Sequence, residues 1–127
     1  MVNAIRPISI IAKSTRIGNE NFTKRFNIPY SSSFAKKSEV TGVPLDIIEQ
    51  VNSRGMGAWS SGHRVGVTKQ QWGRSRVDSF LTLGCAAFSG DYDLLKKVKS
   101  LPKNKKRTYF LEQTPSCPKS KIKKFLG

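Results

Sequence analysis

The side chains that could do chemistry gather between residues 54 and 95, but their spacing does not complete a catalytic or metal-binding site. His63, the only histidine, stands beside Arg64 in a glycine-rich segment, where both could contact phosphate, although a lone histidine is more often structural. Asp91 and Asp93 are two residues apart, without a nucleophile, a metal-ligand cluster or a phosphate-binding loop. We therefore expect a protein that is not an enzyme and that needs no metal or cofactor.

The two cysteines lie in different contexts, Cys85 near the end of an expected helix and Cys117 between two prolines. Their spacing matches neither a zinc site nor the CxxC motif of redox proteins. We expect both to be free thiols.

Positive charge is concentrated at the two ends of the chain, whose formal net charge is +15. Residues 1–30 contain five basic and one acidic side chain, residues 31–95 contain seven and six, and residues 96–127 contain eleven and one. A nearly neutral middle between basic arms is typical of a protein whose arms bind a polyanion, most often nucleic acid. The candidate nucleic-acid-binding residues are His63, Arg64, Lys96, Lys97, Lys99, Lys103, Lys105, Lys106, Arg107, Lys119, Lys121, Lys123 and Lys124.

Two other partners fit the same charge pattern. Residues 119–126 mix lysines with apolar side chains, as helices at anionic membrane surfaces do, but the segment is short for that role. An acidic protein surface would also attract basic arms. No stretch approaches the ~18 apolar residues of a membrane span, and nothing indicates a small-molecule substrate.

Helix signals predict a mostly α-helical protein. We expect a small bundle of about four short helices over residues 31–100, with extended basic arms at residues 1–30 and 101–127. The first helix is expected over residues 34–40, between capping serines and Gly42, and the second from Pro44 to about Ser53.

Two further helices are expected after a glycine- and serine-rich loop. Thr68 and Gln71 match a capping box, which places the start of the third helix at residue 69. Asp91 would cap the fourth helix, and Pro102 would stop it. Residues 108–111 could form a short strand, but the surrounding lysines and prolines favour an extended tail.

Periodicity assigns the faces of these helices. Gly73 would let a neighbouring helix approach closely, Arg76 would lie over an aromatic ring or pair with Asp91 or Asp93, and Asp78 would lie on the outer face. Trp59 and Trp72 could stack on bases, although helical spacing favours the core. The expected core residues are Leu45, Ile48, Val51, Trp72, Val77, Phe80 and Leu81.

The sequence motifs between residues 54 and 94 resemble those of a small uncharacterised domain encoded by tailed phages and large DNA viruses. The resemblance covers about residues 34–95, and its residues are Arg54-Gly55, Ala58-Trp59, Gly62-His63-Arg64, Gln71-Trp72-Gly73, Arg76-Val77, Ser79-Phe80 and Asp91-Tyr92-Asp93-Leu94. Val65 stands where the family pattern has proline, and Cys85 where it has a basic residue. The resemblance implies a virus-encoded protein, found in the virion or host cytoplasm, and adds no catalytic residues.

Our leading hypothesis is a virus-encoded, non-enzymatic structural protein that is associated with the virion or nucleoid. Its basic side chains would contact the charged phosphate backbone of the nucleic acid. The first alternative is a DNA-binding regulator that uses residues 34–52 as a helix-turn-helix. Asp46 and Glu49 would then meet phosphates and base acceptors unfavourably. The second alternative is a ribosomal-type protein that threads its basic arms into folded RNA.

Overall fold

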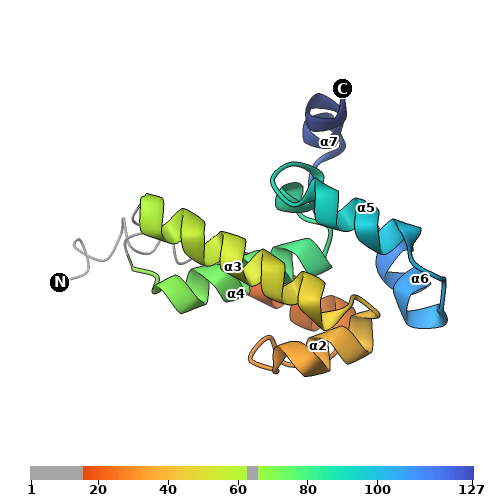
Figure 1. Ribbon diagram of the computed structural model, residues 1–127, viewed down its shortest axis with the longest axis horizontal. Helices are drawn as coiled ribbons and strands as arrows, with labels where there is room; N and C mark the ends of the chain where they lie inside the picture. Colours follow the sequence, from red (N-terminus) through yellow and green to blue (C-terminus); the bar gives the residue numbers. More distant parts are fainter. Residues whose placement is uncertain (1–15, 63–65) are drawn as a thin grey trace.

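The computed structural model describes residues 16–62 and 66–127, which form helices joined by short turns (Figure 1). The first helix that the structure describes covers residues 16–26. It is followed by α2 (Phe34–Thr41), α3 (Leu45–Ser61), α4 (Lys69–Leu81), the 3-10 helix η1 (Cys85–Phe88), α5 (Tyr92–Ser100), α6 (Lys105–Glu112) and α7 (Lys119–Leu126). These residues contain no strand, which confirms the mostly helical prediction.

Local signals place both ends of α2 and the start of α4 correctly. The Ser33 hydroxyl accepts a hydrogen bond from the first turn of α2, and Gly42 ends that helix in the left-handed conformation, with φ of 75°. Thr68 and Gln71 form both bonds of the predicted capping box at the start of α4. These ends were predictable because each depends on residues within one turn of the boundary.

Helices α3 and α4 lie side by side (Figure 1), and two glycines allow the close packing. A Cβ atom on Gly55 of α3 would lie 2.9 Å from the Cα atom of Gly73 on α4, and one on Gly73 would lie 2.8 Å from Met56 Cγ. A Cβ atom fits at neither glycine of this crossing, so the predicted role of Gly73 is confirmed.

The segments predicted as extended arms contribute helices to the same core. The expected number of about four helices is too low, and extended structure is wrong for residues 16–26, 105–112 and 119–126. Phe22 of the first helix and Phe110 of α6 are fully buried, and the Phe110 ring stacks on Phe80 at 5.9 Å between centroids. Packing of the Phe110 anchor stabilises α6, whose sequence carries little apolar periodicity.

The core differs from the expected one around α3. Leu45 is 38% exposed and Ile47 is buried instead, while the helix continues through Gly55 and Gly57 to Ser61. The main apolar residues of the core are Phe22, Val43, Ile47, Ile48, Val51, Val77, Phe80, Leu81, Leu94, Leu95, Val98 and Phe110.

An ion pair between Lys37 of α2 and Asp78 of α4 lies inside this core. The distance from Nζ to Oδ1 is 2.7 Å, and both side chains are fully buried, so the outer position expected for Asp78 is wrong. The ammonium also lies 4.8 Å from the centre of the Phe22 ring. Loss of hydration lowers the pKa of Lys37 and raises the pKa of Asp78 to about 6, and their mutual attraction only partly offsets this effect.

Candidate nucleic-acid interface

Ten of the predicted nucleic-acid-binding cations lie exposed on α5, α6, α7 and the turn between α5 and α6. We call them the lysine surface: Lys96, Lys97, Lys99, Lys103, Lys105, Lys106, Lys119, Lys121, Lys123 and Lys124. Among the residues that the structure describes, no carboxylate pairs with any of them. The helices that carry them are drawn in cyan (α5), blue (α6) and dark blue (α7) in Figure 1. Their ammonium groups are therefore open to an anionic partner.

Arg107 differs from the ten lysines because its guanidinium is bonded within the protein. Its Nε donates to the Gly42 carbonyl at 2.9 Å, and Nη1 donates to the Pro102 carbonyl. A Cβ atom on Gly42 would lie 2.6 Å from the Arg107 amide nitrogen, so α6 begins directly against the turn between α2 and α3. Arg107 thus holds α6 in place.

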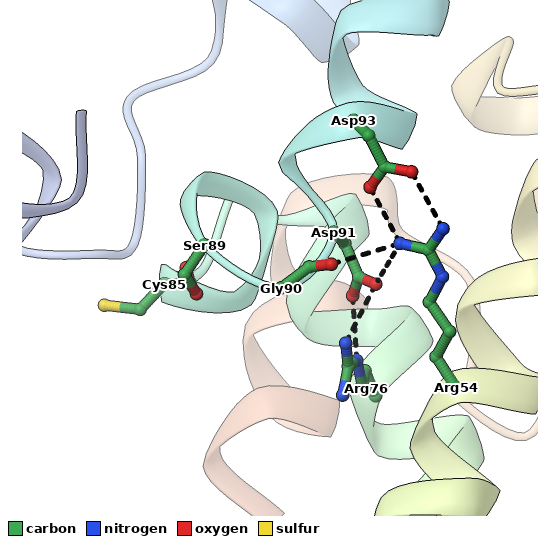
Figure 2. A network of polar contacts seen from close by, with 7 residues as sticks. All are labelled: Arg54, Arg76, Cys85, Ser89, Gly90, Asp91 and Asp93. Atoms are coloured by element: carbon green, nitrogen blue, oxygen red, sulfur yellow. Dashed lines mark hydrogen bonds and ion pairs between the residues drawn. The ribbon is translucent and has the colours of Figure 1, made fainter.

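A network of two arginines and two aspartates fixes the start of α5 (Figure 2). Arg76 of α4 binds Asp91 through two bonds of 2.8 and 2.9 Å. Arg54 of α3 binds Asp93 through two bonds of 2.7 and 2.8 Å, and it also reaches the Gly90 carbonyl at 3.0 Å and Asp91 at 3.4 Å. Bidentate pairs of this kind add directional specificity to the charge attraction, so α5 has a defined direction relative to α3 and α4.

This network corrects the role expected for Asp91. Asp91 stands at the N-cap of α5, but its carboxylate makes no capping bond and is fully buried against the arginines. The predicted pairing of Arg76 with Asp91 is confirmed, whereas the role of Arg54 was not predicted from sequence. The hydrogen bond from Arg54 lowers the pKa of Asp93 to about 2 and raises the pKa of Arg54 further. The two acids that precede the lysines of α5 in sequence are therefore paired with arginines.

Tyr92 organises two of the lysines on α5. The ammonium groups of Lys96 and Lys99 lie 5.2 and 5.8 Å from the centre of its half-buried ring. An aromatic face attracts a cation at such distances while leaving it accessible to solvent and anions. The two charges are thus held on one side of the helix.

A disulfide between Cys85 and Cys117 joins η1 to the segment before α7, with Cα atoms 4.7 Å apart. The expectation of free thiols is therefore wrong. Spacing rules identify metal and redox motifs, but they do not reveal a pair that the fold brings together across 32 residues. Ser116 adds hydrogen bonds to the Thr82 carbonyl through its backbone and its hydroxyl. In Figure 2 the Cys85 sulfur points away from the arginine–aspartate network.

His63 and Arg64 lie outside the described residues. The neighbouring Trp59 is half-buried and donates from Nε1 to the Val67 carbonyl at 2.7 Å, which ties the end of α3 to the start of α4. Trp72 is half-buried on α4. Residues 16–62 and 66–127 contain neither a helix long and apolar enough to cross a membrane nor a cluster of side chains suited to a metal ion.

Comparison with known proteins identifies a family. A search of curated proteins and of solved structures returned no match to this chain. The sequence profile of a family of unknown function, DUF5824, matches residues 6–94. This range includes Arg54, Arg76, Asp91 and Asp93, and it ends before the lysine surface begins at Lys96. The chain therefore belongs to DUF5824, a family of unknown function.

Proposed function

We propose that this chain is a non-enzymatic structural protein that binds nucleic acid through its lysine surface, with little preference for sequence. The observation that carries the proposal is the group of ten exposed lysines, unpaired among the described residues, in a region whose single acid is Glu112. So strong an imbalance exceeds what solubility requires of a small protein.

The chemistry of lysine supports contact with the phosphate backbone. An ammonium group is a compact point charge without the planar fork that arginine uses to read base edges. Each phosphate that it neutralises releases counterions, so about six contacts on duplex DNA would give a slope near −5 in a plot of log K against log salt concentration. Binding of this kind is strong at low salt and nearly independent of sequence.

The folded position of the lysines also supports binding. The arginine–aspartate network orients α5, Arg107 anchors α6, and the Cys85–Cys117 disulfide attaches the segment that leads into α7. Because the backbone that carries the charges is already ordered, binding loses less conformational entropy than it would with an extended arm.

The proposal includes a viral origin of the protein. The resemblance of the motif residues to a domain of tailed phages and large DNA viruses suggests a virion- or nucleoid-associated protein, for which an acidic capsid surface is a second possible partner. Helices α2 and α3 with the turn at Gly42 have the outline of a helix-turn-helix. Asp46 and Glu49 are exposed near the start of α3, however, so we favour backbone contact over major-groove recognition.

The test is fluorescence anisotropy of labelled duplex DNA, single-stranded DNA and structured RNA with the full chain across a salt series. We expect binding to all three that weakens steeply as salt rises. No binding to any of them at about 50 mM salt would refute the proposal. One duplex sequence that stays bound in excess competitor DNA would favour the helix-turn-helix alternative.

A further inference from the structure

An open hollow of about 450 Å³ lies beside the lysine surface, between the first helix and α6. Its lining residues are Arg25, Tyr109, Glu112, Gln113 and Thr114. Tyr109 is 57% exposed, which is more than any other large hydrophobic residue that the structure describes. An exposed aromatic ring at the edge of a strongly basic surface is the usual component of a site for an unstacked base.

The Tyr109 ring is held in place although most of it is open. Its hydroxyl donates to the Arg25 carbonyl at 3.3 Å, and its ring meets the Phe26 ring at 82° with 6.0 Å between centroids. Both contacts come from the first helix, so the ring orientation is fixed before a ligand arrives. A base that stacks on it would not have to order the side chain first.

The polar groups of the hollow differ in their availability. The Arg25 guanidinium donates through Nη1 to Gln113 Oε1 at 3.0 Å, to the Thr82 carbonyl at 3.3 Å and to the Thr114 carbonyl, so this nitrogen is occupied within the protein. Glu112 is exposed and is the only acid between residues 96 and 127. Its carboxylate is an acceptor that the described residues leave without a hydrogen bond or an ion pair.

Three side chains of different chemistry, a cation, an aromatic ring and a carboxylate, lie on one side of α6. Lys105, Tyr109 and Glu112 stand at positions i, i+4 and i+7 of the helix, which share one side. A nucleotide along this side would meet an ammonium at its phosphate, a ring at the face of its base and a carboxylate at the edge of its base. Single-strand recognition commonly combines these three contacts.

We propose that Tyr109 and Glu112 form a site for an unpaired base, with guanine preferred. A carboxylate accepts two hydrogen bonds side by side, and guanine presents adjacent N–H donors at N1 and N2 on its Watson–Crick edge. Thymine and uracil present one donor between two carbonyl oxygens, which the carboxylate would repel. The inference rests on the proposed function, because the lysines must first hold the phosphate backbone.

The test compares three labelled probes of about 12 nucleotides with the full chain: a thymine-only strand, a thymine strand with separated guanines, and the duplex of the second. We expect the guanine strand to bind about fivefold or more tightly than the thymine strand. Tyr109→Leu should weaken binding of the guanine strand about fivefold or more, with duplex binding unchanged. Tyr109→Phe keeps the stacking ring but loses the hydrogen bond to the Arg25 carbonyl, so it should bind the guanine strand more tightly than Tyr109→Leu does. Thermal unfolding of both variants checks their fold.

Glu112→Gln should remove the preference for guanine over thymine. The quantity to compare is the ratio of the affinities of Glu112→Gln for the guanine strand and the thymine strand. A single affinity would not suffice, because loss of a negative charge raises binding to every polyanion. An unchanged ratio, or an equal loss on single strand and duplex in Tyr109→Leu, would overturn the base site and leave charge-driven binding intact. Failure of the wild type to bind any of the probes at low salt would refute the proposed function and the base site together.

Discussion

Replacing Lys37 with methionine should expose the energetic cost of the buried ion pair. The substitution keeps an apolar stem of similar length against Phe22 but leaves the Asp78 carboxylate in the core without its 2.7 Å partner. Breaking a buried pair by removing one partner costs about 3–5 kcal/mol, because an uncompensated charge remains. Since domains are stable by about 5–15 kcal/mol, we expect Lys37→Met to fold with a much lower free energy of unfolding.

The double variant Lys37→Met/Asp78→Leu is the matched control. Replacing both members of a buried pair with apolar groups is often neutral or stabilising, by about 1–4 kcal/mol. We therefore expect the double variant to unfold at a urea concentration at or above that of the wild type, and the single variant well below it. Urea titration followed by circular dichroism, with the disulfide kept oxidised, gives the three free energies of unfolding.

The pH dependence separates this explanation from a general packing defect. The pKa of Asp78 is about 6 in the folded protein, whereas the ordinary value of an aspartate is 3.8. Between pH 3.8 and 6 the folded state therefore binds a proton that the unfolded chain does not. The contribution of such a group to stability is largest below pH 3.8 and is lost as pH rises through 6.

In Lys37→Met the pKa of Asp78 should rise further, because the ammonium that lowers it is gone. The single variant should then regain up to about 1.4 kcal/mol per pH unit as pH falls from about 8 to 5, relative to the double variant. A cost below about 1 kcal/mol for Lys37→Met, a double variant as unstable as the single one, or an absent pH dependence would refute the reasoning.

Two further predictions concern the helix crossing and the disulfide. Gly55→Ala should destabilise the protein by about 1–3 kcal/mol, because the new Cβ atom would lie 2.9 Å from the Cα atom of Gly73. A Cβ atom on Gly57 would have no atom within 4 Å. Gly57→Ala should therefore be neutral or stabilise by up to about 1 kcal/mol in the same urea titration. Equal effects of the two alanines would contradict the close packing of α3 and α4. Replacing Cys85 and Cys117 together with serine should cost about 3–4 kcal/mol for a loop of 32 residues, as measured by thermal unfolding. An unchanged melting temperature would mean that the bridge does not constrain the chain.

The parts of the fold that sequence predicts are those with local causes. The Thr68–Gln71 capping box, the left-handed Gly42 and the need for a glycine at position 73 each follow from residue types within a turn or from the absence of a side chain. The range of α2 and the start of α4 follow from the same signals.

Interactions between distant residues explain what sequence reasoning missed. Arg54 meets Asp93 across 39 residues, and Cys85 meets Cys117 across 32, and neither pairing leaves a spacing rule in the sequence. A lysine in the core is also unexpected because lysine is rarely fully buried, and only the position of Asp78 on the facing helix explains Lys37.

Helices α6 and α7 were missed for a related reason. Their sequences are rich in lysine, and α6 carries a single fully buried anchor, Phe110. With this one anchor, α6 lacks the apolar periodicity that predicts a helix, and α7 buries no residue. The basic character of the C-terminal region was nevertheless predictable, because charge is a property of composition. Whether this region binds nucleic acid stays a prediction.

The most direct test of that prediction compares two variants that lose the same charge. One replaces Lys119, Lys121 and Lys123 of α7 with glutamine, and the control replaces three lysines outside the lysine surface, Lys24, Lys36 and Lys69, all exposed. The measurement is the salt dependence of duplex DNA binding by anisotropy. If α7 contacts phosphates, the slope of log K against log salt should become shallower by up to about 2.7 in the first variant and stay at the wild-type value in the control. Equal changes in the two variants would contradict binding through the lysine surface, since net charge alone would then explain the affinity.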